Sequence, residues 1–378
     1  MEKKIQKYLY KLLEVKGSDL HLKAGSEVHV RVFGELHTIH GDKLTTEEVE
    51  EIARRVLTDT QYKTLVENQE IDSTYSLEKT KRFRVNFFYQ VNGLSAVFRV
   101  IPSEVLSLDA LHIPKIVKKL ADLNHGLVLI TGTSGSGKST TMAALIDRIN
   151  KTTRKHIISI EDPVEYLHIE DKCLISQRSV GTSTHSFKNG LRSALREDID
   201  IIFIGELRDL ETVEIALHAA NTGHLVVSTL HTLDAKETIS RILGMFPKEE
   251  QARIRMTLSF VLEGIVSQRL IPTTDGKRIP AVEVMMKTQR ISGLIAENRD
   301  SEILESIAQG KEIYGTQSFD QSLFELYTQN KIKESDALRY ATNTSDMNLQ
   351  IQGINRDVGY ESVKSINSLK TRTSFDLK

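Results

Sequence analysis

The chain has 378 residues, more than one hydrophobic core usually organises, so we expect two domains. Its 50 Lys and Arg residues against 51 Asp and Glu give a formal net charge of −1, which offers no reason to expect nucleic acid as the main partner. Cys173 is the single cysteine, which excludes an internal disulfide or a four-cysteine zinc site and favours a reducing, cytosolic compartment. In its apolar run, Cys173 is predicted to be a buried structural thiol.

Residues 1–100 are predicted to form an α+β domain. Ile5, Leu9 and Leu12 recur at helical spacing, and Thr45 with Glu48 forms a capping-box pattern that starts a helix reaching residue 57. Alternating apolar residues predict strands over 28–33, 36–39, 82–88 and 96–100. No apolar run approaches the ~20 residues that span a bilayer, and the N-terminus lacks the apolar core of a signal peptide.

The pattern changes after a linker placed at residues 101–115. Continuous apolar runs over 127–130, 157–160, 201–204 and 225–228 alternate with helical stretches, as in a doubly wound α/β domain. We expect this domain to cover residues 116–342. The remaining 343–378 are rich in Ser, Asn, Lys and Thr and are expected to be disordered or loosely attached.

One segment matches the phosphate-binding loop pattern G-x-x-x-x-G-K-[ST], with a buried strand before it and a helix after it. Glycines let the backbone fold around phosphates, the lysine reaches the β- and γ-phosphates, and the serine hydroxyl is a Mg²⁺ ligand. A merely flexible Gly/Ser loop is the disfavoured alternative. The predicted nucleotide-binding residues are Gly132, Thr133, Ser134, Gly135, Ser136, Gly137, Lys138, Ser139 and Thr140.

Two acids stand at predicted strand ends, where open α/β sheets bind their ligands. Glu161 ends one apolar run, and Glu206 follows another after Gly205. We expect both carboxylates to converge on the nucleotide, although solvated loop acids are the alternative. His224 and His231 bracket a third strand, and each taken alone is more often structural than functional.

Together these blocks resemble the motor ATPases of type II secretion and type IV pili: the phosphate loop, an Asp box over 160–165, an atypical Walker B over 204–209 and a His box over 224–231. Segments 18–22, 82–86 and 267–270 are also similar to signatures of that family. The single cysteine and the short N-terminal region resemble its pilus-retraction branch, PilT and PilU. The resemblance implies a RecA-like P-loop core preceded by a smaller α+β, PAS-like domain.

The resemblance also implies roles that the residues alone leave open. Glu161 would activate the attacking water, Glu206 would hold Mg²⁺ or its water shell, and His231 would sense the γ-phosphate, with His224 in the same box. Members of the family work as homohexameric rings at the cytoplasmic face of the inner membrane, on a pilus platform protein. Independently of the resemblance, Lys138 is the one obvious cation that the loop offers to the phosphates, so arginines of the first domain could complete a neighbouring subunit's site. The candidates are Arg82, Arg84 and Arg99, and the alternative is that they are solvated strand residues or form salt bridges within their own domain.

Three other functions stay open at this stage. The chain could be an accessory retraction ATPase that needs a partner motor, a nucleotide-gated scaffold without useful turnover, or a DNA-translocating RecA-like protein. The presence of both Glu161 and Glu206 disfavours the scaffold. The balanced charge disfavours the DNA translocase.

Overall fold

The computed structural model describes residues 2–32, 34–40, 43–78, 81–101 and 105–353. Contacts divide the chain into two compact units. The first consists of Met1–Val105 with the short segments Ile160–Ile169 and Gln177–Ser186, and the second holds Leu106–Ser159, Glu170–Ser176 and Phe187–Lys378. The sequence-based boundaries did not anticipate the two short segments.

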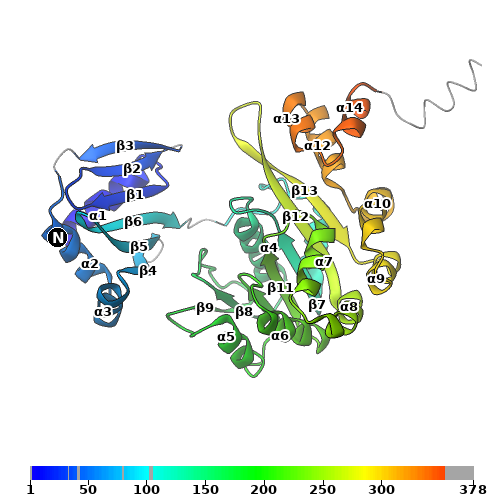
Figure 1. Ribbon diagram of the computed structural model, residues 1–378, viewed down its shortest axis with the longest axis horizontal. Helices are drawn as coiled ribbons and strands as arrows, with labels where there is room; N and C mark the ends of the chain where they lie inside the picture. The colour runs from blue at the N-terminus through cyan, green and yellow to red at the C-terminus, as the bar shows by residue number, and fades with distance from the viewer. Residues whose placement is uncertain (1, 33, 41–42, 79–80, 102–104, 354–378) are drawn as a thin grey trace, which may run out of the picture. The chain divides into compact units, whose positions relative to one another are not determined.

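The first unit carries a six-stranded sheet in the order β3-β2-β1-β6-β5-β4, antiparallel at every pairing (Figure 1). Its strands are β1 (Asp19–Lys23), β2 (Val28–Val32), β3 (Glu35–His40), β4 (Glu70–Ser76), β5 (Arg82–Gln90) and β6 (Gly93–Ile101). Its helices are α1 (Glu2–Glu14), α2 (Thr46–Val56) and α3 (Asp59–Asn68). The capping box predicted at Thr45 and Glu48 is present at the start of α2.

The three helices of this unit pack on one face of the sheet. Phe83, Val85 and Phe87 alternate along β5 toward them and are fully buried, while the residues between them are only partly covered. Leu9 of α1 and Ile52 of α2 belong to the same core. Arginines that alternate with the buried residues of β5 therefore lie on the other face.

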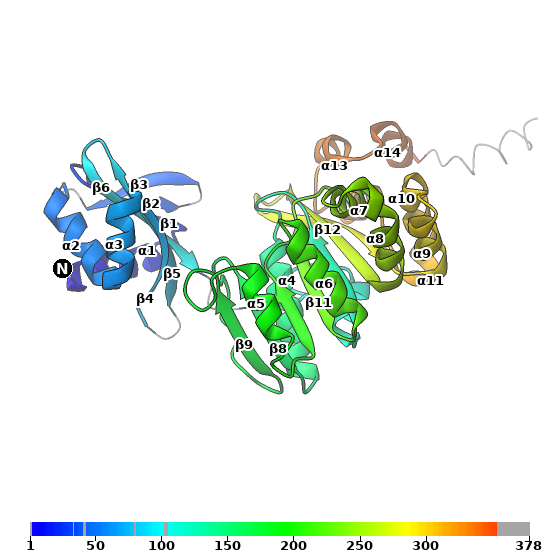
Figure 2. The same ribbon diagram turned by 60° about the horizontal axis from the view of Figure 1, so that its bottom comes forward.

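The second unit is built on a seven-stranded sheet in the order β13-β12-β7-β11-β10-β8-β9. Figure 2 labels β12, β11, β8 and β9 of this sheet. Strands β12, β7, β11 and β10 pair in parallel, and β12 pairs with β13 antiparallel. The strands are β7 (Gly126–Thr131), β8 (His156–Glu161), β9 (Leu174–Ser179), β10 (Ile201–Ile204), β11 (Leu225–Leu230), β12 (Leu262–Pro272) and β13 (Arg278–Met286). This α+β unit followed by a RecA-like core confirms the predicted fold class.

Helices cover both faces of this sheet, so its central strands are buried on both sides. Val128, Phe203 and Val227 point to the core shared with Leu145 and Ile149 of α4. The helices are α4 (Lys138–Thr152), α5 (Phe187–Ala194), α6 (Leu210–Asn221), α7 (Ala235–Gly244), α8 (Lys248–Val261), α9 (Gln289–Ala296), α10 (Ile303–Gln309) and α11 (Lys311–Tyr314), with a 3₁₀ helix over Lys115–Asp122. Cys173 is buried and unpaired, as predicted.

Three further helices, α12 (Phe319–Thr328), α13 (Glu334–Tyr340) and α14 (Thr344–Ile351), form a small bundle near the β12–β13 hairpin (Figure 1). Here the expectation of a loose tail from residue 343 is wrong for α14. Met347 is 1% exposed and packs in one cluster with Phe319 and Leu323. Asp320 also accepts the backbone N–H groups of Thr342 and Asn343, at 2.6 and 3.0 Å. Residues 354–378 lie outside the described part of the chain.

Candidate active site

The phosphate loop joins the end of β7 to the start of α4 and depends on glycine. Gly132 has φ +143°, and a Cβ there would lie 2.4 Å from both the Gln268 carbonyl oxygen and Ser136 Oγ. Gly135 and Gly137 also have positive φ, at 76° and 94°. Any side chain at 132 would therefore displace the loop from β12, which explains the first glycine of the motif.

Lys138 is the first residue of α4 and is only 8% exposed. Its Nζ donates to the carbonyl oxygens of Gly132 and Thr133 at 2.8 and 2.9 Å, so the ammonium group is held over the loop. The positive end of the α4 dipole lies at the same place, and a helix start after a glycine-rich loop is an anion site. The cradle therefore fits the phosphates of a nucleotide.

Strand β12 supports this loop from the side, through residues that the sequence marked only as a signature. Thr131 Oγ1 donates to Ser267 Oγ at 3.0 Å, and Gln268 Nε2 donates to Thr141 Oγ1 of α4 at 2.9 Å. Ser267 and Gln268 are both buried. The polar residues of β12 thus hold the strand before the loop and the helix after it.

Glu206 lies two residues beyond β10 and contacts the side chains of Arg208 and His231. Arg208 Nε and Nη2 donate to its oxygens at 2.5 and 3.2 Å, and His231 Nε2 lies 3.4 Å from Oε2. Partial burial tends to raise the pKa of Glu206, but Arg208 and His231 outweigh it and hold the pKa below its usual range. Glu206 is therefore ionised near neutral pH and suited to hold a cation or its water. Arg208 belongs to the Walker B segment, but its contact with Glu206 was not predicted from the sequence.

The two histidines of the His box lie at opposite ends of β11. Leu230 pairs with Thr131, and its carbonyl oxygen accepts the Gly132 N–H at 3.3 Å, so His231 follows the strand at the phosphate-loop end. The His224 carbonyl oxygen instead accepts from Gly126, at the start of β7. Its Nδ1 lies 3.2 Å from the Ala219 carbonyl oxygen. The structure thus brings His231 to the predicted site but leaves His224 a strand length away.

Glu161 is the last residue of β8 and is 8% exposed. Its Oε2 accepts the backbone N–H of Glu165 at 3.5 Å, and its carbonyl oxygen accepts the Val180 N–H at 2.9 Å. In the sheet order, β10 and β11 separate β8 from β7. Glu161 is thus a buried carboxylate at the end of a strand three places from the phosphate-loop strand.

The three candidate arginines sit on β5 and β6 of the first unit. Arg84 and Arg99 are direct cross-strand neighbours. Arg99 Nε bonds Asp19 at 2.7 Å, and Arg84 lies 3.5 Å from Asp72, yet their side chains keep 67% and 41% exposure. Arg82 is two residues before Arg84 on the same face. Ion pairing within their own sheet orients Arg84 and Arg99 and leaves both partly accessible.

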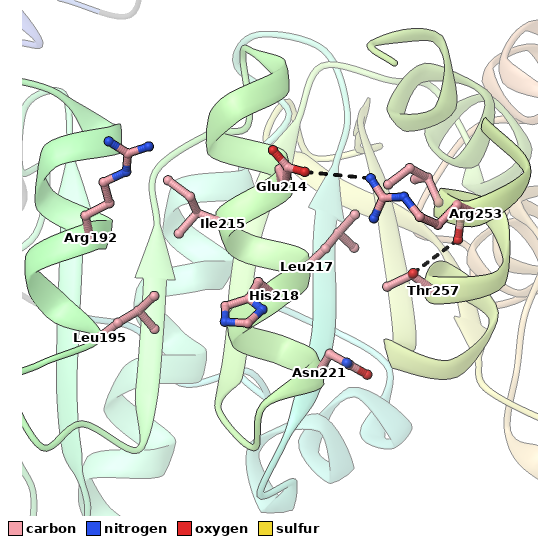
Figure 3. A pocket seen from close by; sticks show the side chains of 10 residues that line it. Arg192, Leu195, Glu214, Ile215, Leu217, His218, Asn221, Arg253 and Thr257 are labelled. Atoms are coloured by element: carbon pink, nitrogen blue, oxygen red, sulfur yellow. Dashed lines mark hydrogen bonds and ion pairs between the residues drawn. The ribbon is translucent and has the colours of Figure 1, made fainter. Parts of the chain in front are cut away.

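A groove of about 400 Å³ lies elsewhere in the second unit, between α5, α6 and α8 (Figure 3). Leu195, Ile215 and Ile254 contribute its apolar lining, and Glu214 pairs with Arg253 at 3.7 Å across it. None of the predicted nucleotide residues lines it. We therefore do not assign the nucleotide to this groove.

The described residues contain no group of three or more His, Cys, Asp or Glu side chains that could hold a metal. Mg²⁺ in phosphoryl transfer needs no such group, because one or two side chains and the phosphates complete its shell. Ser139 and Glu206 fit that need. Among the helices of the described part, none is long and apolar enough to cross a membrane.

The fold and this site define a P-loop ATPase. The chain belongs to the type II/IV secretion system protein family, whose model matches residues 1–359. It is 44% identical over 320 residues to the type IV pilus retraction ATPase PilT of Pseudomonas aeruginosa, covering 85% of this chain and 93% of that protein. It is 39% identical over 348 residues to the type IV pilus ATPase PilU of the same organism, covering 92% and 91%.

A solved structure gives the same relationship in three dimensions. A crystal structure described as the pilus retraction motor PilT with bound ADP superposes with a TM-score of 0.84 at 40% identity. The match covers 90% of this chain and 98% of that one. The resemblance predicted from the sequence motifs is thereby confirmed.

Proposed function

We propose that the chain is an ATP-hydrolysing motor subunit that powers type IV pilus retraction and twitching motility. The observation that carries the proposal is the phosphate loop with Lys138 held over it, in a chain similar along most of its length to PilT. The similarity to PilU leaves an accessory retraction ATPase as the second candidate.

In this proposal the backbone of the phosphate loop and Lys138 bind the phosphates of ATP and neutralise charge that grows in the transition state. A bound Mg²⁺ would supply further positive charge to the phosphates. Ser139 and Glu206 are the residues that would hold it, and the ionised state of Glu206 supports this role.

Glu161 is proposed as the base that accepts the proton of the attacking water at its carboxylate. Its burial at a strand end supports the assignment, because a base shielded from solvent is more effective. His231, at the end of β11 beside Glu206, would contact the γ-phosphate and report its presence. We assign no catalytic role to His224.

We further propose that the subunits assemble as a homohexameric ring at the cytoplasmic face of the inner membrane, on the pilus platform protein. In such a ring Arg82, Arg84 or Arg99 of one subunit would complete the nucleotide site of the next. Mixing Lys138→Ala with Arg99→Ala subunits tests this arrangement, since restored ATPase activity requires a shared site. Wild-type activity of each arginine variant alone would reject it.

The function itself is tested in cells by deleting the gene and counting surface pili. A retraction motor predicts excess pili and no twitching, both restored by the wild-type chain and not by Lys138→Ala. An accessory motor predicts partial twitching or dependence on a second ATPase. Unchanged piliation and twitching would contradict a role in retraction.

A further inference from the structure

A row of four paired residues crosses the sheet of the second unit next to the active site. Leu230 of β11 pairs with Thr131 of β7, Thr131 pairs with Ser267 of β12, and Ser267 pairs with Glu283 of β13. Leu230 directly precedes His231, and Thr131 directly precedes the phosphate loop. The row therefore connects Glu283 to the start of the phosphate loop and to the start of the loop that carries His231.

Glu283 is also bonded to the segment that carries His231. The loop of residues 231–234 leaves β11 at Leu230 and enters α7 at Ala235, whose backbone N–H donates to Glu283 Oε1 at 2.9 Å. Both ends of the loop are thus fixed to the same row of residues.

Within the loop, side chains tie it to α7 rather than to the sheet. Thr232 Oγ1 lies 2.7 Å from Thr238 Oγ1, and the Leu233 N–H donates to Glu237 Oε2 at 2.8 Å. The loop and the first turn of α7 therefore form one body. Glu283 holds the helix start of that body, next to the loop, while the buried Ile239 and Ile242 pack the rest of α7.

A carboxylate is an uncommon choice for this place, because Glu283 is only 1% exposed. Burying a carboxyl group is costly unless a specific interaction needs it. The N-terminal N–H of a helix is such a partner, since it combines a hydrogen bond with the positive end of the helix dipole. Simple packing would have been served by an apolar residue, as the buried Ala281 and Met285 on the same face of β13 show.

We propose that Glu283 is a positioning residue for ATP hydrolysis: by holding the first N–H of α7 it fixes the loop that places His231 against Glu206. The inference rests on the proposed function, in which His231 acts at the γ-phosphate. Glu283 itself does not touch the nucleotide in this scheme. Its loss should impair turnover while the phosphate loop still binds nucleotide.

The test compares purified full-length variants in steady-state ATPase and ADP-binding assays. Glu283→Leu removes the acceptor and should lower kcat on the order of tenfold, as small misplacements of catalytic groups do. Its Kd for ADP should stay within about twofold of wild type, because the phosphate loop is intact. Glu283→Gln keeps a side chain of the same length with an acceptor oxygen, and it should have the kcat of wild type.

Two further variants separate positioning from general damage. Ala235→Pro removes the donor instead of the acceptor, at a first helical position where proline is tolerated, and should lower kcat as Glu283→Leu does. This variant tests the same hydrogen bond even if Glu283→Leu fails to fold. Ser322→Ala is the control: Ser322 Oγ accepts the N–H of Val282, next to Glu283, but holds α12 rather than α7. It should keep wild-type kcat.

Wild-type kcat in folded Glu283→Leu and Ala235→Pro would overturn the inference, and so would an equal loss in Ser322→Ala. His231→Ala distinguishes this failure from that of the proposed function. If His231→Ala loses turnover while Glu283→Leu does not, Glu283 is not the anchor and the role of His231 stands. If His231→Ala hydrolyses ATP at the wild-type rate, the proposed role of His231 is wrong. The positioning role of Glu283, which depends on it, is then wrong too.

Discussion

Glu206 Oε2 lies 3.4 Å from His231 Nε2, which joins the second residue after β10 to the first residue after β11 at the phosphate-loop end of the sheet. Arg208 donates to both oxygens of the same carboxylate. Glu206 thus contacts both the Arg208 guanidinium and the His231 ring. This arrangement makes its charge sensitive to Arg208.

Arg208→Ala should shift the acid limb of the pH–rate profile upward. Burial raises the pKa of Glu206, and Arg208 is the main group that lowers it, so removing Arg208 raises the pKa. A carboxylate with a lowered pKa keeps its charge until the pH falls through that pKa, so the variant should lose kcat/KM at a higher pH than wild type. The profile from pH 4.5 to 8 measures this, with Arg253→Ala as an exposed-arginine control. Superimposable profiles would reject the coupling.

Glu161→Gln should bind ATP but hydrolyse it on the order of a hundredfold or more slowly, because an amide cannot accept the proton of water. Glu206→Gln should instead raise the Mg²⁺ concentration needed for half-maximal activity. Measuring the rate against Mg²⁺ for both variants separates the two roles. Normal hydrolysis by Glu161→Gln would make Glu206 the first candidate for the base.

Glu283→Gln should change how stability depends on pH. Burial is the main cause that raises the pKa of Glu283 from 4.5 to about 7; the Ala235 N–H and Arg269 oppose it, while Asp234 and Asp320 add to it. The folded state then binds the proton more tightly, so the stability from this group is complete below pH 4.5 and is lost as pH rises through 7.

Glutamine never ionises, so the variant should be more stable than wild type at pH 8, by up to about 3 kcal/mol. The advantage should vanish near pH 4.5. Chemical denaturation at both pH values measures it. An equal difference at the two pH values would show that the carboxyl group does not titrate in this range.

Met347→Ala should destabilise the C-terminal helices by about 2–5 kcal/mol, because it leaves a cavity at a fully buried site. Gln350→Ala on the exposed side of α14 is the matched control and should change little. Hydrogen exchange of the α12–α14 amides, measured as a function of urea, gives the free energy of unfolding for both variants. Equal behaviour of the two variants would mean that α14 is not anchored through Met347.

The local part of this structure could be predicted from sequence. Strand β10 has the predicted bounds, and the capping box at Thr45 and the phosphate loop form as expected, because each depends on residues adjacent in the chain. The long hairpin of β12 and β13 was missed, since its polar residues Ser267 and Glu283 are satisfied only by distant partners.

The same reason limits what sequence shows of the site. His224 and His231 look equivalent along the chain, but a six-residue strand carries them to opposite ends. The partners of Glu206 and Glu283 become visible only once the strands are in register. Met347 looked like part of a polar tail, because the apolar side chains that cover it come from α12.

The central claim is that this chain hydrolyses ATP at the loop that holds Lys138, and the steady-state release of phosphate by the purified protein tests it most directly. Wild type should hydrolyse ATP. Lys138→Ala should fold normally but lose several kcal/mol of transition-state stabilisation, and its rate of phosphate release should fall accordingly. Lys151→Ala, on the exposed side of the same helix, should match wild type. Near-normal turnover by well-folded Lys138→Ala would contradict the account.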